Sequence, residues 1–155
     1  MLEVDQPAPG FELENQDGET VSLADFEGAP LVLYFYPKAG TPGCTQEACS
    51  FRDAWDDFEA ADVAVVGISD DPVADIAKFR EKYDLPFDLL SDEDGAVSST
   101  YDSYGEKKMF GNTFDGVFRN TFVVGPGGTV VAVFEGVDPE GHAEEVIAAV
   151  DADRE

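Results

Sequence analysis

Positive charge is scarce in this sequence, and so is sulfur. Nine Lys and Arg residues stand against 34 Asp and Glu residues, which gives a formal net charge of −25 at pH 7, and there are only two Cys residues and one His. Nucleic acids and anionic membrane surfaces bind cationic patches on proteins. Neither is therefore an expected partner of this chain.

A long hydrophobic run is also missing. The longest one, PLVLYFYP at 30–37, is well short of the about 20 apolar residues that a membrane-spanning helix needs. The first residues, MLEVDQPAPGFEL, lack the basic and apolar regions of a signal peptide. We therefore expect a cytoplasmic protein, in a compartment where thiols are kept reduced.

The acidic residues are spread along the whole chain rather than gathered in one block. Dissolved salt screens the mutual repulsion of many carboxylates, so our hypothesis is a halophilic protein, adapted to a cytoplasm of high salt. The alternative is an acidic surface that binds a cationic partner.

The length of 155 residues predicts a single domain, 1–155. The pattern of apolar residues and turns predicts strands in a hairpin at 11–23, at 29–37, 62–70 and 86–92, and in a second hairpin at 119–136; it predicts helices at 44–61, 71–84, 94–105 and 139–152. A parallel β–α–β unit followed by an antiparallel hairpin and a last helix is typical of an α/β thioredoxin-like fold. We expect a central mixed sheet with helices on both faces and an added N-terminal β-hairpin.

Both cysteines lie just after the predicted strand 29–37, in the stretch YFYPKAGTPGCTQEACSFRD. Thr41 is a candidate N-cap and Pro42 suits the first position of a helix, which puts Cys44 in the first helical turn. There the free backbone N–H groups and the positive end of the helix dipole favour a thiolate. The thiolate is the nucleophilic form of cysteine, so the sequence predicts a reactive Cys44.

Cys44 and Cys49 are five residues apart. On one continuous helix this spacing separates their Cα atoms by about 8.6 Å, and a disulfide rarely tolerates more than about 7 Å. Either the two cysteines never pair, or the first turn unwinds to let them. The second option describes a redox cycle with a helical reduced state and a locally unfolded oxidised state.

Other interpretations of the same residues compete with a redox site. Taken alone, Cys49 is more typical of a small buried apolar residue, and two cysteines with one histidine do not complete a four-ligand zinc site. His142, on the last predicted helix, is expected to have no catalytic role. Arg119 opens a β-rich run, and the residues alone favour an ion pair with one of the many acids. The alternative is that Arg119 points at Cys44 and favours its thiolate.

The stretch YPKAGTPGCTQEAC resembles the peroxiredoxins, specifically the bacterioferritin-comigratory or PrxQ-type thiol peroxidases. The motif Pro-x-x-x-Thr-x-x-Cys is present as Pro37, Thr41 and Cys44. The resemblance extends from VDQPAPGFEL through GEKKMFGNTFDGVFRNTFVVGPGG to the last predicted helix. It implies a thiol-dependent peroxidase that reduces hydrogen peroxide and organic hydroperoxides, in antioxidant defence and redox homeostasis.

The resemblance also implies a role for each residue of the motif. Cys44 would be the peroxidatic cysteine and Cys49 the resolving one, joined after the reaction in an intramolecular disulfide. Pro37 would shield the site, Thr41 would hydrogen-bond the peroxide, and Arg119 would polarise the peroxide and hold the thiolate. A thioredoxin- or glutaredoxin-like protein would supply the electrons. The reaction would need no metal or organic cofactor. We expect the protein to be a monomer or at most a weak dimer.

Two further functions are weighed against the peroxidase. The first is a general dithiol–disulfide oxidoreductase acting on proteins. The cysteine spacing argues against it, because four residues separate the two cysteines, whereas the redox motif of such enzymes has two. The second is a redox sensor whose oxidised, unwound state binds a partner. Such a sensor would be oxidised once per molecule, without turnover.

Overall fold

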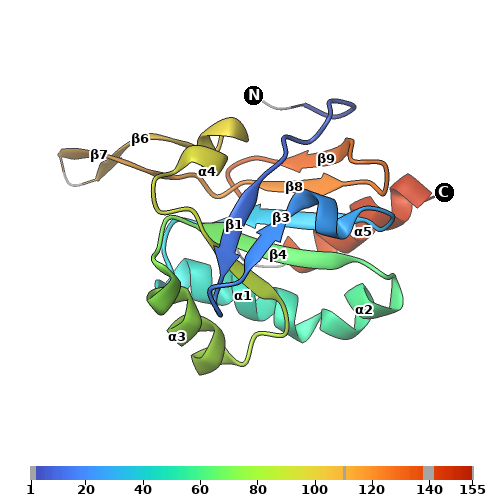
Figure 1. Ribbon diagram of the computed structural model, residues 1–155, viewed down its shortest axis with the longest axis horizontal. Coiled ribbons are helices and arrows are strands. Elements are labelled where there is room, and N and C mark those ends of the chain that lie inside the picture. The colour runs from blue at the N-terminus through green and yellow to red at the C-terminus, as the bar shows by residue number, and fades with distance from the viewer. Residues whose placement is uncertain (1–2, 110, 138–141, 155) are drawn as a thin grey trace.

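The computed structural model describes residues 3–109, 111–137 and 142–154, and its centre is a seven-stranded mixed sheet (Figure 1). The strands lie in the order β2-β1-β5-β4-β3-β8-β9. Their bounds are β1 (Glu12–Asn15), β2 (Thr20–Ser22), β3 (Leu31–Phe35), β4 (Ala64–Ser69), β5 (Asp88–Ser91), β8 (Thr121–Val124) and β9 (Val130–Phe134). The three middle strands β5, β4 and β3 are parallel, and β1 and β8 pair with them antiparallel. The expected mixed sheet of a thioredoxin-like fold is confirmed.

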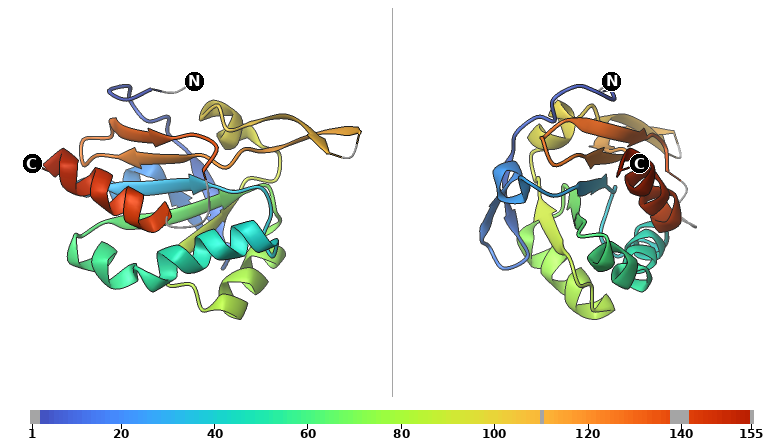
Figure 2. Two further views of the ribbon diagram at one scale, coloured as in Figure 1. Left: turned by 180° about the vertical axis from the view of Figure 1, so that it is seen from behind. Right: turned by 90° about the vertical axis from the view of Figure 1, so that its right-hand side faces the viewer.

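Helices cover the sheet unequally (Figure 2). The longer helices pack on one face, together with the short α2: they are α1 (Pro42–Asp53), α2 (Trp55–Ala60), α3 (Val73–Tyr83) and α5 (His142–Arg154). The other face is covered by α4 (Ala96–Thr100) and the 3₁₀ helix Leu23–Phe26. No helix in the described part of the chain is long and apolar enough to cross a membrane.

Strand β3 shows why both faces must be covered. Successive side chains of a strand point to opposite faces, and on β3 both sets are apolar or aromatic. Val32 and Tyr34 face the longer helices, whereas Leu31, Leu33 and Phe35 face α4 and the 3₁₀ helix. All five residues are buried, as the continuous apolar run predicts for a central parallel strand.

Both predicted hairpins are confirmed. β1 and β2 pair antiparallel around the turn that begins at Asn15, and β8 and β9 pair around Gly125–Gly128. The predicted helix 44–61 is broken into α1 and α2 at Ala54, which has φ −95° and ψ 9°. Helix α3 begins one residue later than the Asp-Pro pattern predicts, because Pro72 is the N-cap. The Asp71 carboxylate instead accepts hydrogen bonds from the Ala39 N–H and the Ser69 hydroxyl.

A third hairpin is present that the pattern does not predict. Strands β6 (Tyr104–Met109) and β7 (Asn112–Val117) form a separate two-stranded sheet that extends away from the body (Figure 1). The predicted helix 94–105 is consequently short, because its last residues belong to β6. Of the last predicted helix, residues 139–141 lie outside the described residues, and α5 begins at His142.

The sheet brings two distant segments together at one end. β3 pairs with β8 in the register Tyr34↔Thr121, and the Phe35 N–H donates to the Asn120 carbonyl at 2.8 Å. Arg119 lies two positions before β8. The loop from β3 to α1 therefore begins beside Arg119. This pairing positions the site.

Candidate active site

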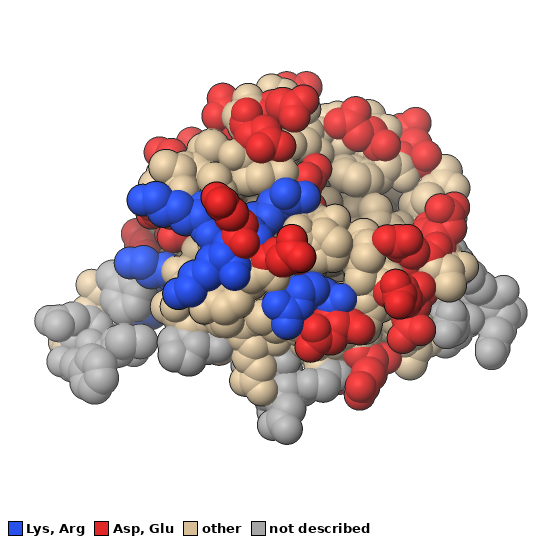
Figure 3. Space-filling model, turned by 90° about the horizontal axis from the view of Figure 1, so that it is seen from below, with Lys and Arg blue, Asp and Glu red and all other residues tan. Residues whose placement is uncertain are grey.

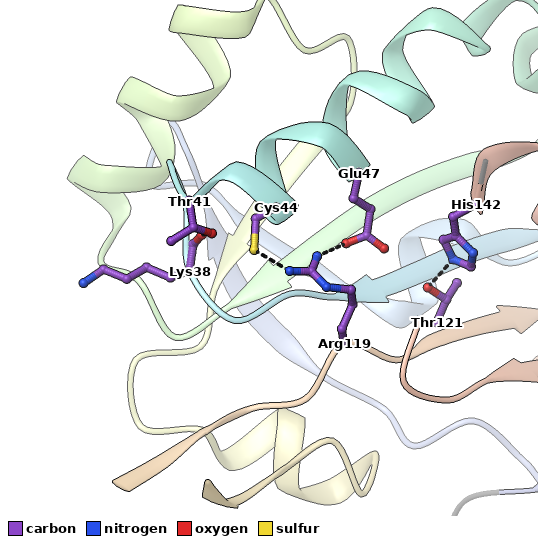
Figure 4. A network of polar contacts seen from close by, with 7 residues as sticks. All are labelled: Lys38, Thr41, Cys44, Glu47, Arg119, Thr121 and His142. Carbon is purple, nitrogen blue, oxygen red and sulfur yellow. Dashed lines mark hydrogen bonds and ion pairs between the residues drawn. The ribbon is translucent and has the colours of Figure 1, made fainter. Parts of the chain in front are cut away.

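Cys44 lies in the first turn of α1 with its sulfur turned inward (Figure 4). The helix begins as the sequence predicts, with Thr41 as N-cap and Pro42 as the first helical residue. Cys44 is only 1% exposed and is a free thiol. A hydrogen bond joins it to Arg119, whose Nη2 donates to the Cys44 Sγ at 3.1 Å. Two residues 75 positions apart in the sequence therefore meet at the start of one helix.

Arg119 makes a second contact through its other terminal nitrogen. Its Nη1 donates to Oε1 of Glu47 at 2.8 Å, and the Glu47 side chain is completely buried. The guanidinium thus lies between a sulfur and a carboxylate on the same helix (Figure 4). Both sequence-based interpretations of Arg119 hold: it is paired with an acid, and it points at Cys44.

Glu47 is a site residue that the sequence analysis missed. Burial raises its pKa to about 7, although the charge and hydrogen bond of Arg119 act in the opposite direction. Its second oxygen, Oε2, is buried without a hydrogen-bond partner among the described residues. The sequence does contain a signal for Glu47. Cys44, Glu47 and Phe51 recur at the spacing of one helix face, and a carboxylate is unusual on a face that is otherwise apolar.

Tyr34 and Tyr36 lie beneath the same part of α1. Their ring centroids are 5.4 Å apart, and both hydroxyl groups are buried without a hydrogen-bond partner in the described part of the chain. Burial, with the neighbouring phenol next, raises the pKa of Tyr34 well above its ordinary value. These phenols therefore stay neutral and add no charge next to Cys44 and Glu47.

The loop before α1 holds the other residues of the motif. Thr41 does not cap the helix with its side chain; its hydroxyl donates to the Lys38 carbonyl at 2.8 Å. Because this hydrogen is already used, the Thr41 oxygen is left to accept a hydrogen bond from a further group. Pro37 is half-buried in the same loop, which the Ala39 N–H fixes to the Asp71 carboxylate at 2.7 Å.

Cys49 is half-buried on α1, and it is also a free thiol. Residues 42–53 form one uninterrupted helix that contains both cysteines. The two therefore have the i, i+5 relation that keeps a disulfide from forming while the helix is intact.

His142 lies apart from Cys44. Its Nε2 is 2.8 Å from the Thr121 hydroxyl, and its ring packs edge-on against Phe51 and Phe134. Burial lowers the pKa of His142 below its ordinary value, although the nearby Glu145 raises it. In Figure 4 the imidazole lies beyond Glu47, on the side away from the sulfur. The expectation that it has no catalytic role stays a prediction.

Comparisons with known proteins agree on one group of relatives. The chain matches the model of the AhpC/TSA family over residues 4–133. It is 44% identical over 140 residues to peroxiredoxin Bcp of Escherichia coli, which covers 90% of each chain. Among solved structures it is similar to bacterioferritin comigratory protein of Xanthomonas campestris, a protein with alkyl peroxide reduction activity, with a TM-score of 0.90, 36% identity and coverage of 100% and 99% of the two chains. A cysteine variant of PrxQ from Xylella fastidiosa gives a TM-score of 0.93 at 31% identity, with the same coverage.

Proposed function

This chain belongs to the AhpC/TSA family, among the Bcp and PrxQ peroxiredoxins, and from that premise we propose that Cys44 is the cysteine that attacks the peroxide. The protein is a thiol-dependent peroxidase. The observation that carries the assignment of Cys44 is the 3.1 Å contact between the Arg119 guanidinium and its sulfur. A fixed positive charge beside a buried sulfur favours the thiolate over the thiol.

In the first step the Cys44 thiolate attacks the terminal oxygen of the peroxide. The S–O bond forms as the O–O bond breaks, and the electron pair leaves on the distal oxygen, which takes a proton and departs as water or an alcohol. Arg119 is placed to meet the negative charge that develops on the departing oxygen. The Thr41 oxygen accepts a hydrogen bond from the peroxide, which fixes the direction of attack. Cys44 is left as a sulfenic acid.

In the second step Cys49 resolves the sulfenic acid. The first turns of α1 unwind, the Cys49 thiolate attacks the Cys44 sulfur, and the hydroxyl group leaves with a proton as water. An intramolecular disulfide is the product. The continuous helix of the reduced protein supports this order of events, because the bond needs a change of conformation.

In the third step a thioredoxin- or glutaredoxin-like dithiol reduces the disulfide by exchange, and its own two thiols become a disulfide. The reductant restores both cysteines of the peroxidase to thiols. We propose the cytoplasm as the location of this peroxidase, because the proposed cycle needs a compartment in which thiols are kept reduced.

A peroxide-consumption assay with a thioredoxin system tests the assignment. We expect Cys44→Ser to abolish turnover, and Cys49→Ser to consume one equivalent of peroxide and then recycle slowly. Undiminished turnover of Cys44→Ser would refute the site. The assay also separates the other functions, since a redox sensor is oxidised once without turnover and a general oxidoreductase acts on protein disulfides without peroxide.

A further inference from the structure

Positive charge gathers on one face of this acidic molecule. Figure 3 shows Lys and Arg side chains grouped on the side where α3 and the start of α1 lie, with acids around them. Three lysines, Lys38, Lys78 and Lys82, line a groove of about 220 Å³. We call it the lysine groove. Its wall also includes Phe79 and Tyr83, which give it an apolar floor.

The three ammonium groups are without an acidic partner in the described part of the chain. Although the sequence holds 34 acids and only 9 bases, none of the three lysines makes an ion pair with a described residue. Of the two acids in the groove, Asp71 is buried and its carboxylate is engaged by the loop, whereas Asp75 is exposed.

The stability of α3 explains only part of this cluster, because Lys82 lies in the last turn of the helix, where the helix dipole favours a cation. Lys78 and Lys82 lie four residues apart on the same helix face, where like charges destabilise a helix. Lys38 comes from another segment and adds a third positive charge to the same groove. The cluster is therefore better suited to an outside anionic group than to the fold itself.

The lysine groove borders the redox site on two sides. Lys38 belongs to the loop before α1, and its carbonyl accepts the hydrogen bond of Thr41. On α1, Arg52 donates from Nη1 to the Tyr83 carbonyl at 2.8 Å, which ties α1 to the end of α3. Cys49 precedes Arg52 by three residues, so the half-buried Cys49 lies on a neighbouring part of the same helix face.

We propose that the lysine groove is the docking surface for a protein dithiol reductant that carries acidic side chains around its reactive cysteines. This inference rests on the proposed function, which requires such a reductant. A chain of net charge −25 repels an acidic protein over most of its surface. The lysine groove is the exception, because its unpaired lysines attract the acidic side chains of the reductant. The apolar floor of the groove adds area that the contact can bury.

The reaction at this surface is a disulfide exchange. A thiolate of the docked reductant attacks one sulfur of the Cys44–Cys49 bond, and the other cysteine leaves as a thiolate. The second thiol of the reductant then displaces the remaining cysteine. Two electrons pass from the reductant, which ends as a disulfide, to the peroxidase, which ends as two thiols.

The test uses two double variants with the same change of net charge. Lys78→Gln with Lys82→Gln removes two positive charges from the groove. Ala24→Glu with Ala60→Glu adds two negative charges at exposed positions on the 3₁₀ helix and α2. Each oxidised protein is mixed with reduced acidic thioredoxin, with dithiothreitol and with glutathione, and the reduction rate is followed by alkylation of the released thiols and mass spectrometry. Peroxide oxidation is measured separately.

We expect the groove variant to be reduced by thioredoxin about tenfold more slowly at low salt, and the difference to shrink in 1 M salt as charge is screened. Dithiothreitol should reduce all variants equally. A groove variant reduced by thioredoxin at the wild-type rate, or a control variant slowed as much, would overturn the proposal. The proposal would also be overturned if glutathione, but not thioredoxin, reduced the groove variant more slowly than the wild type. Slower reduction of the groove variant by uncharged dithiothreitol would overturn it as well. Failure of the proposed function is distinct, because the wild-type protein would then form no disulfide with peroxide.

Discussion

Cys44 and Cys49 share helix α1 five residues apart, and the first is buried while the second is half-exposed. Cys44 is held inside by the guanidinium of Arg119. A disulfide between them requires residues 42–49 to leave the helix. The proposed reaction therefore includes a local unfolding step that the folded structure opposes.

Glu47 lies inside the segment that must unwind. When the segment opens, the Arg119–Glu47 ion pair is lost together with the Arg119–Cys44 contact. The peroxide reaction itself weakens this arrangement, because a sulfenic acid is neutral where the thiolate carried a charge. Arg119 then loses the charge of one of its two partners and keeps the Glu47 carboxyl, whose pKa burial raises to about 7. Oxidation of Cys44 is thus coupled to the opening that brings Cys49 to it.

Helix propensity within the unwinding segment should set the rate of disulfide formation. Gln46 is exposed in α1, so Gln46→Gly and Gln46→Ala change propensity without disturbing the buried side. The two variants differ by about 1 kcal/mol in helix stability, which predicts disulfide formation about fivefold faster for Gln46→Gly. At high peroxide the Ala variant should accumulate more Cys44 sulfinic acid, measured by mass spectrometry.

The matched control for this pair is Ala74→Gly in α3, another exposed helical position. It should lower the stability of the protein and leave the rate of disulfide formation unchanged. Equal rates for the two Gln46 variants would contradict an unwinding step that limits the reaction.

Arg119→Lys should slow peroxide attack by about tenfold to a hundredfold. A guanidinium donates from two nitrogens to two acceptors at once, whereas an ammonium is a point charge that cannot match this planar fork. Loss of one charge-assisted hydrogen bond is worth about 1.5–3 kcal/mol. Single-turnover oxidation of Cys44 by peroxide, followed by mass spectrometry, measures this rate. Arg80→Lys is the control, because Arg80 bonds the Phe87 carbonyl away from the cysteines; a similar loss there would argue against a specific role.

Local signals in the sequence were sufficient for the start of α1. Thr41, Pro42 and the run that follows predict where the helix begins, and their positions place Cys44 in its first turn. Arg119 needed more than local information, because its approach to Cys44 depends on the pairing of β3 with β8. The residues alone left two interpretations open, and the resemblance favoured one.

Two features were missed for different physical reasons. Glu47 is one of 34 acids in the sequence, and only its burial on the inner face of α1 sets it apart. Strands β6 and β7 are not predicted, because they pair with each other in a separate two-stranded sheet outside the central one. Long-range burial and isolated pairing of this kind leave little trace in a local pattern.

The acidic surface predicts a protein that is stabilised by salt. Repulsion within a chain of net charge −25 falls as the Debye length shrinks from about 10 Å at 0.1 M salt to about 3 Å at 1 M. We expect the melting temperature in multimolar KCl to lie clearly above that in dilute buffer. Sucrose of matched viscosity is the control. Equal melting temperatures at low and high KCl would reject the halophilic hypothesis and favour an acidic surface for a cationic partner.

Glu47 should make the stability of the reduced protein fall as the pH rises from about 5 to 8. Burial raises the pKa of Glu47 from 4.5 to about 7, so between these values the folded chain keeps a proton that the unfolded chain has released. The free energy of unfolding therefore decreases through this window by up to about 3 kcal/mol, and the decrease is complete near pH 8, once the folded protein has also released the proton. The side chain introduced by Glu47→Gln is neutral at every pH, so the stability of this variant lacks the decrease. Denaturant unfolding of both proteins, in a Cys44→Ser background that removes the thiol titration, should show the variant gaining relative stability toward pH 8. Exposed Glu81→Gln is the control, and pH profiles that run parallel with and without the Glu47→Gln substitution would contradict a buried carboxyl of raised pKa.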